Sequence, residues 1–107
     1  MFKKVIIDGK ETELMANAAT PFRYKQVFGR DLFSILGNEQ KAETEGVEAV
    51  TELAYIMSKQ AEKADMNKLT KDDFLAWLEG YGSMAFIGAA EDIMNVYMEQ
   101  ATGTATP

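Results

Sequence analysis

The sequence predicts an α+β domain that is mostly α: an N-terminal β-hairpin packed on a bundle of about four helices. Three observations predict this fold. A short apolar run, Val5–Ile7, leads into an Asp-Gly pair that is typical of a tight hairpin turn. Apolar residues then recur at helical spacing in several stretches, some of which begin with helix-capping residues. The chain has 107 residues, of which 47% are hydrophobic, which is enough for one small domain and too little for two.

The hairpin is expected to consist of a strand over Phe2–Asp8 and a return strand over Lys10–Ala16. Gly9 supplies the positive φ that a tight turn needs. The side chains of the return strand alternate, so that one face carries two glutamates and the other carries Thr12 and Leu14. Because an isolated hairpin is only marginally stable, this one has to pack on the helices.

The first helix is expected to start at Pro21 and to run to about Phe28. Thr20 is expected to cap it, because its hydroxyl can accept a hydrogen bond from a free N–H of the first turn. Proline at the first helical position loses only an N–H that has no partner there. Gly29 either ends this helix or is an interior glycine.

A short second helix and a polar stretch come next. Asp31 is expected to cap a helix over Leu32–Leu36, which Gly37 closes. Residues Asn38–Gly46 are polar and acidic with little apolar content, and they predict a loop.

The clearest long helix is expected over Gly46–Lys63, and a turn over Asp65–Lys68. Thr70 is expected to cap the following helix, with Asp73 reaching back to it as in a capping box. That helix ends at the glycines 80 and 82. The apolar residues of the long helix recur at three- and four-residue steps: Val47, Val50, Ala54, Met57 and Ala61.

The last helix is expected over Ser83–Gln100, so that a single domain covers residues 1–100 and Ala101–Pro107 forms a flexible tail. A broad, methionine-rich apolar stripe runs along this helix, and methionine side chains adapt to varied apolar partners. Two interpretations stay open: the whole stripe is core, or its wider edge binds a partner helix. The residues predicted to bind a partner are Phe86, Ile87, Met94, Tyr97 and Met98.

Composition argues against most catalytic chemistry. The chain has no cysteine and no histidine, so it has no disulfide, no thiol chemistry and no ordinary zinc site, and it lacks the commonest general base. No Gly-rich phosphate loop, Ser/His/Asp set or metal cluster is present, which predicts a non-enzymatic protein without a cofactor or metal. The segment Asp65–Ala76 departs from a calcium-binding loop, because Thr70 replaces the turn glycine and Ala76 replaces the bidentate glutamate.

Charge is unevenly distributed along the chain, whose net charge is −6. Residues 1–36 carry six Lys or Arg and four Asp or Glu, whereas residues 37–107 carry five and thirteen. Such an acidic chain is a poor ligand for a phosphate backbone, so nucleic acid is not an expected partner. The apolar run Val5–Ile7 is too short for a signal peptide or a membrane span, which predicts a cytosolic protein without a membrane partner.

The order of these elements resembles one known family. A hairpin with the turn Asp8-Gly9-Lys10, followed by the segment AATPFRYKQVFGRDLF (residues 18–33), is similar to the tail assembly chaperones of long-tailed bacteriophages and prophages of Gram-positive bacteria. The pattern covers roughly the first third of the chain, and the later helices match only in general character. The resemblance lies in the order of the elements and in the residues of this segment, and it includes no catalytic motif.

The resemblance implies a non-enzymatic assembly factor in the host bacterial cytoplasm. Proteins of this family bind the tape measure protein, a long chain of apolar helical segments, before the tail tube closes around it, and they are absent from the mature virion. Many copies coat that chain, so self-association is a further expectation. A longer product often arises by translational frameshifting, and its extension contacts the tail tube protein. Two alternatives remain open: a small phage adaptor protein with another partner, and a minor structural tail subunit.

Overall fold

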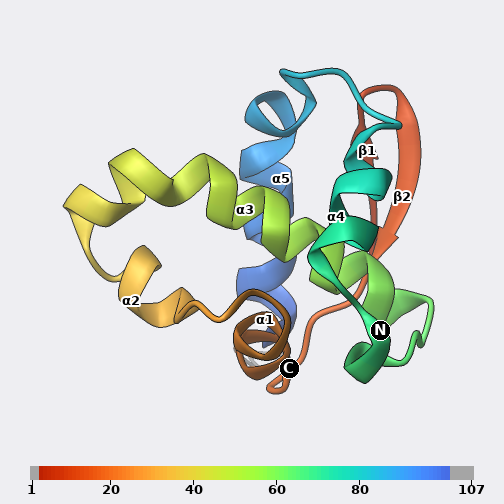
Figure 1. Ribbon diagram of the computed structural model, residues 1–107. Helices are drawn as coiled ribbons and strands as arrows, with labels where there is room; N and C mark the ends of the chain where they lie inside the picture. Colours follow the sequence, from red (N-terminus) through yellow and green to blue (C-terminus); the bar gives the residue numbers. More distant parts are fainter. Residues whose placement is uncertain (1–2, 102–107) are drawn as a thin grey trace, which may run out of the picture.

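A computed structural model describes residues 3–101 of the chain. Within them a two-stranded antiparallel hairpin precedes five α-helices and one short 3-10 helix (Figure 1), which confirms the predicted α+β, mostly α fold. The predicted C-terminal tail starts at Ala101, which is the last residue of the last helix, and residues 102–107 lie outside the described residues. The elements are β1 (Lys3–Ile7), β2 (Lys10–Leu14), α1 (Thr20–Phe28), α2 (Leu32–Leu36), α3 (Glu39–Ala61), η1 (Met66–Lys68), α4 (Lys71–Leu78) and α5 (Ala85–Ala101).

The hairpin turn has the geometry that its sequence predicts. Asp8 and Gly9 both have positive φ, 54° and 75°, which matches the right-handed twist of the flanking strands. The register places Val5 opposite Thr12, and both side chains are buried on the face that packs against the helices. The predicted alternation in the return strand is confirmed, because Thr12 and Leu14 are buried and the two glutamates are exposed.

The turn residues also attach the hairpin to the linker between α4 and α5. The backbone N–H of Gly82 donates to Oδ2 of Asp8 at 2.9 Å, and Nζ of Lys10 donates to the carbonyl oxygen of Gly80. The same Nζ lies 4.8 Å from the centre of the Tyr81 ring, a cation–π contact. We call these contacts the hairpin clasp. The Asp-Gly-Lys turn therefore has a structural role. Asp8 and Lys10 bind the linker, and Gly9 provides the positive φ of the turn.

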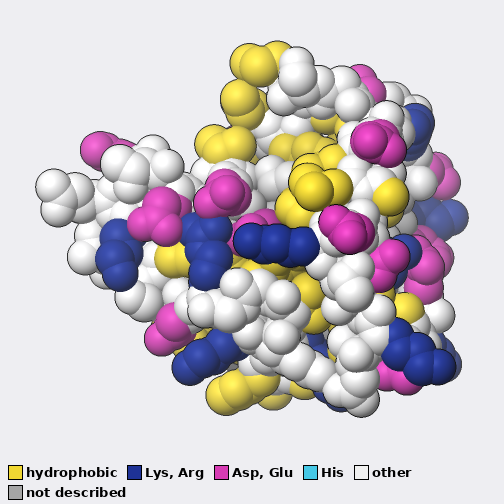
Figure 2. Space-filling model, in the orientation of Figure 1, with side chains coloured by type: hydrophobic (Ala, Val, Ile, Leu, Met, Phe, Trp, Pro, Cys, Tyr) yellow, Lys and Arg dark blue, Asp and Glu magenta, His cyan; other side chains and the backbone are white. Residues whose placement is uncertain are grey.

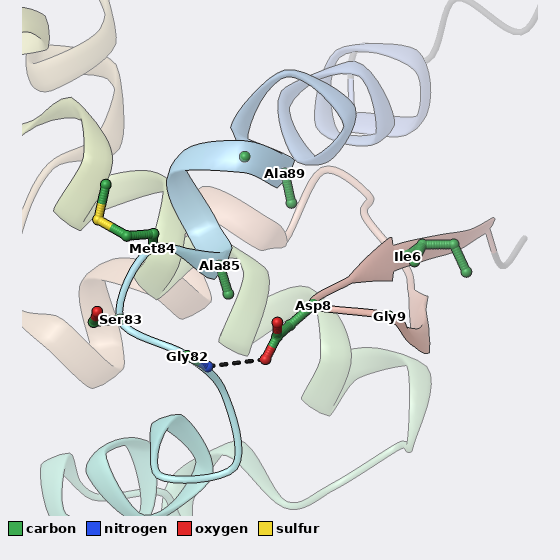
Figure 3. A pocket seen from close by; sticks show the side chains of 9 residues that line it. Ile6, Asp8, Gly9, Gly82, Ser83, Met84, Ala85 and Ala89 are labelled. Carbon is green, nitrogen blue, oxygen red and sulfur yellow. Dashed lines mark hydrogen bonds between the residues drawn. The ribbon is translucent and has the colours of Figure 1, made fainter.

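A hollow of about 580 Å³ lies between the hairpin turn and the start of α5. Figure 3 shows the Asp8 side chain reaching from the turn to Gly82, with Ile6 and Met84 on opposite sides of the hollow. Asp8 is the only charged side chain among the described residues that line it, and its carboxylate already bonds to the linker. We therefore assign this hollow to the packing of the hairpin on α5.

The third helix starts earlier than predicted, so the predicted loop over Asn38–Gly46 is wrong. Asn38 is the N-cap of α3, and its Oδ1 accepts from the N–H of Lys41 at 3.1 Å. Residues 39–45 are rich in glutamate, glutamine, lysine and alanine, which favour a helix even where little of it is buried. Val47 belonged to the predicted buried stripe, but it is exposed because these first turns project from the domain.

The middle of α3 is buried on all sides and forms the centre of the core. In Figure 1 it crosses α5, with the hairpin and α4 at one end and α2 at the other. The helix contacts β2, α1, α2, α4 and α5. The fully buried large apolar side chains come from both strands, α1, α2, α3 and α5: Ile7, Leu14, Tyr24, Leu32, Leu53, Tyr55, Ile56, Met57 and Ile93.

The start of α1 differs from the prediction that Thr20 is its N-cap. Ala19 occupies the cap position, and Thr20 is the first helical residue, with its side chain fully buried. The Thr20 hydroxyl accepts from the N–H of Asn17 at 2.9 Å and donates to Oε1 of Gln60 at 2.7 Å. The hydroxyl therefore ties the start of α1 to the last turn of α3, a long-range bond that local capping rules do not reveal.

The other predicted caps are confirmed. Oδ1 of Asp31 accepts from the N–H groups of Phe33 and Ser34 at the start of α2. Thr70 and Asp73 form the predicted capping box of α4. Gly29 has a φ of 71° and ends α1, so it is not an interior glycine of the helix.

We predict that Thr20→Val lowers the free energy of unfolding by roughly 1–3 kcal/mol, because it leaves the N–H of Asn17 and Oε1 of Gln60 without their partner. Thr20→Ser keeps the hydroxyl and is expected to cost less. Urea denaturation followed by the fluorescence of Trp77 measures both. Equal stability of the valine variant and the parent would contradict the buried role of the hydroxyl.

For the hairpin clasp, we predict that Asp8→Ala costs roughly 1–2 kcal/mol of stability. Alanine removes the acceptor for Gly82 and is disfavoured at the positive φ of this position. Asp8→Asn keeps an acceptor and tolerates that φ, so its melting temperature is expected to lie close to that of the parent. If calorimetry gave the same loss for both variants, the side-chain bond would not be the cause.

Candidate partner-binding surfaces

The predicted partner-binding stripe on α5 does not lie on one open face. Phe86 and Tyr97 are buried, Met94 is partly buried, and Ile87 and Met98 are about half exposed. The reason is that α3 crosses α5 and covers its middle. The core interpretation therefore describes the centre of the stripe, and only its two ends reach the surface.

The C-terminal end of the stripe contributes to an apolar groove between α1, α2 and α5. The groove has a volume of about 540 Å³. We call it the Phe22 groove; its lining residues are Ala18, Pro21, Phe22, Phe33, Leu36, Gly37, Tyr97 and Met98.

Two phenylalanines give the Phe22 groove its apolar character. The side chains of Phe22 and Phe33 are 71% and 62% exposed, unusually high for such large apolar groups. Hydrophobic atoms over α1 are visible at the lower edge of Figure 2. Neither residue is among those predicted from the sequence to bind a partner. The exposure of Phe22 can be inferred from the helical spacing, because Phe22 lies off the face that carries the buried residues Tyr24 and Phe28.

The N-terminal end of the stripe contributes to a second, smaller groove, of about 200 Å³, between α3, the end of α4 and the start of α5. We call it the Ile87 groove; its lining residues are Val47, Thr51, Leu78, Tyr81, Gly82, Ser83, Phe86 and Ile87. Phe86 and Tyr81 also belong to a run of ring contacts that includes Trp77, with centroids 5.1–5.4 Å apart. The single tryptophan therefore lies directly behind this groove.

An arginine fixes the walls of the Phe22 groove. Arg30 lies in the connection between α1 and α2, and its guanidinium binds three carboxylates on one face of α3. The distances are 2.7 Å to Glu45, 2.6 Å to Glu48 and 3.2 Å to Glu52. The arginine cluster therefore ties to α3 the connection between the two helices that carry Phe22 and Phe33.

Glu52 is the buried member of this cluster. Its Oε1 also accepts a hydrogen bond from the hydroxyl of Tyr24, at 2.5 Å. Burial raises the pKa of Glu52 above its ordinary value, although the Tyr24 bond and the charge of Arg30 oppose the shift. Burial and the adjacent carboxylate also raise the pKa of the Tyr24 hydroxyl. This buried carboxylate thus bonds to Tyr24 of α1 and to Arg30 of the α1–α2 connection, and it links both to α3.

Both grooves are lined mainly by apolar side chains. Within residues 3–101, no three acidic side chains are grouped so that they could hold a metal ion. No helix in that range is long and apolar enough to cross a bilayer. Neither groove combines a polar reactive group with a base. Burying a phenylalanine side chain is worth roughly 1.5–3 kcal/mol, so the Phe22 groove can contribute useful affinity for an apolar segment.

Comparisons of the chain with protein-family models, with curated proteins and with solved structures found no match.

We predict that Glu52→Gln changes how stability depends on pH. The folded chain binds the Glu52 proton more tightly than the unfolded chain, so ionisation of this group destabilises the fold as the pH rises above 4.5, its ordinary pKa. The stability of the parent relative to the glutamine variant is therefore expected to fall from that pH towards neutrality. Denaturant titrations at several pH values measure the difference. A difference that grows with pH would contradict the raised pKa.

Proposed function

We propose that this chain is a tail assembly chaperone of a long-tailed phage or prophage of a Gram-positive bacterium. In this proposal it acts without enzymatic chemistry in the host cytoplasm. It binds apolar helical segments of the tape measure protein and keeps them soluble until the tail tube closes. It leaves before the virion is mature.

One observation carries the proposal: the segment on which the family resemblance rests exposes two large aromatic side chains. Residues 18–33 contain Phe22 and Phe33, and both line an apolar groove of about 540 Å³. A monomeric domain has no need to expose them, and contiguous apolar surface of this kind is typical of a protein interaction site. A helix with apolar residues at three- and four-residue spacing can lie in such a groove.

Charge supports the chaperone role. Residues 37–107 are strongly acidic, and most of their carboxylates lie on the surface. A complex between this domain and an apolar helix therefore keeps a substantial net charge, which favours solubility. The Arg30 cluster keeps the groove formed in the absence of a partner, so little ordering is needed on binding.

The test uses helical segments of the tape measure protein encoded beside this chain, with affinity measured by calorimetry. We predict that Phe22→Ser with Phe33→Ser weakens binding by at least about tenfold, because the two rings form the groove walls. Both side chains are exposed, so stability is expected to change little. The matched control, Leu75→Ser, removes an exposed apolar side chain of α4 and is expected to bind normally.

Two results would contradict the proposal. If the parent protein fails to bind any tape measure segment, the chaperone function is wrong and an adaptor with another partner is favoured. If mass spectrometry of purified tails detects the chain as a stoichiometric component, the minor structural subunit is favoured. A genome in which the gene lies between a tail tube gene and a very long tape measure gene agrees with the proposal.

A further inference from the structure

The Ile87 groove offers a second apolar surface that the proposed function does not use. Val47 of α3 and Ile87 of α5 stand at its rim, and each side chain is 49% exposed. Leu75 of α4 and Met84, just before α5, are also exposed. In Figure 2 hydrophobic atoms gather over the start of α5 at the top of the view and over α4 at its centre.

Acidic side chains flank Val47 and Ile87, the two residues at the rim. Residues four apart on a helix are neighbours on its surface, which places Glu43 beside Val47 and Glu91 beside Ile87. On α4, Leu75 has Lys71 on one side and Glu79, the C-cap, on the other. All three glutamates are exposed, and none of them makes an ion pair with another described residue. Figure 2 shows acidic side chains beside the hydrophobic atoms of this face, with a basic side chain next to those at the centre of the view.

No described lysine or arginine lines the groove. Lys10 bonds to the carbonyl oxygen of Gly80 and lies over the Tyr81 ring as part of the hairpin clasp. Lys71, at the start of α4, is exposed but does not line the groove. Arg30 is held by its own three carboxylates on α3. An apolar centre with an unneutralised acidic rim is complementary to a helix that has an apolar face between rows of lysine or arginine.

We propose that the Ile87 groove is a docking site for a basic amphipathic helix of another protein. The partner's apolar face contacts Val47 and Ile87, and its flanking cations pair with Glu43, Glu79 and Glu91. This surface is separate from the Phe22 groove, because it lies at the opposite end of α5 and on the other side of α3. The inference does not depend on the proposed function.

The experiment uses the natural tryptophan as a reporter. The Trp77 ring lies 5.4 Å from that of Phe86 and 5.1 Å from that of Tyr81, and both of those residues line the groove. The probe is a tryptophan-free peptide of leucine and lysine patterned for an amphipathic helix. We expect it to shift the Trp77 emission and to bind at least about tenfold more tightly than a scrambled peptide of the same composition. Its affinity should fall as sodium chloride is raised.

Charge and shape are then separated by variants. Glu43→Lys with Glu91→Lys is expected to weaken the peptide by at least about tenfold. Its control, Glu11→Lys with Glu13→Lys, makes the same change in net charge on the exposed face of β2 and is expected to bind normally. Val47→Ser with Ile87→Ser should abolish the shift in emission, whereas Phe22→Ser with Phe33→Ser should not change it. Each variant is first checked for an unchanged circular dichroism spectrum.

Three results would overturn the inference. If the β2 control weakened peptide binding as much as Glu43→Lys with Glu91→Lys does, the binding would reflect only general attraction between a basic peptide and an acidic protein. Binding that leaves Trp77 emission unchanged would place the peptide elsewhere. Concentration-dependent self-association in sedimentation, abolished by Ile87→Ser, would assign the groove to a second copy of this chain. Because none of these measurements uses a tape measure segment, a failure here leaves the proposed chaperone function to its own test.

Discussion

Every other part of this domain depends on the burial of the middle of α3. From Ala49 to Gln60 nearly every side chain of this helix is buried, so one face of each surrounding element has to cover it. A helix that is apolar on all sides is stable only when it is enclosed. That requirement brings a marginal hairpin, three short helices and α5 into a single core, although few of them would be stable alone.

The polar residues within this buried stretch specify how the neighbours attach. Glu52 binds Tyr24 and Arg30, and Gln60 binds Thr20. Each of these bonds fixes one end of the α1 segment relative to α3. An apolar surface of α3 alone would allow α1 to shift along it. Buried polar pairs prevent this, because a shift would break their hydrogen bonds and leave polar groups buried without partners. The position of α1, which forms one side of the Phe22 groove, therefore depends on the buried bonds of Glu52 and Gln60.

Local patterns were sufficient to predict the hairpin, its turn and the caps at Asp31 and Thr70, because each depends on residues within a few positions. The role of Thr20 was missed because its partner, Gln60, is 40 residues away. The start of α3 was missed because its first turns are polar on every side and gain little from burial. That error also hid the arginine cluster, since Glu45 fell in a predicted loop while Glu48 and Glu52 fell in a helix. The burial of Phe86 and Tyr97 in the predicted partner-binding stripe was not foreseen, because no local pattern shows that α3 crosses α5.

The hairpin clasp has a consequence for the order in which this chain acquires structure. It joins residues that are 70 and 74 positions apart, and the exposed pair between Lys3 and Glu99 spans 96 positions. The two strands therefore depend on partners in α5 and in the linker before it, as well as on α3. Closing such long loops slows folding, and a two-stranded hairpin has little stability before it docks. The hairpin can reach all of these contacts only once the residues up to α5 have been synthesised, and until then its apolar residues stay accessible to other chains.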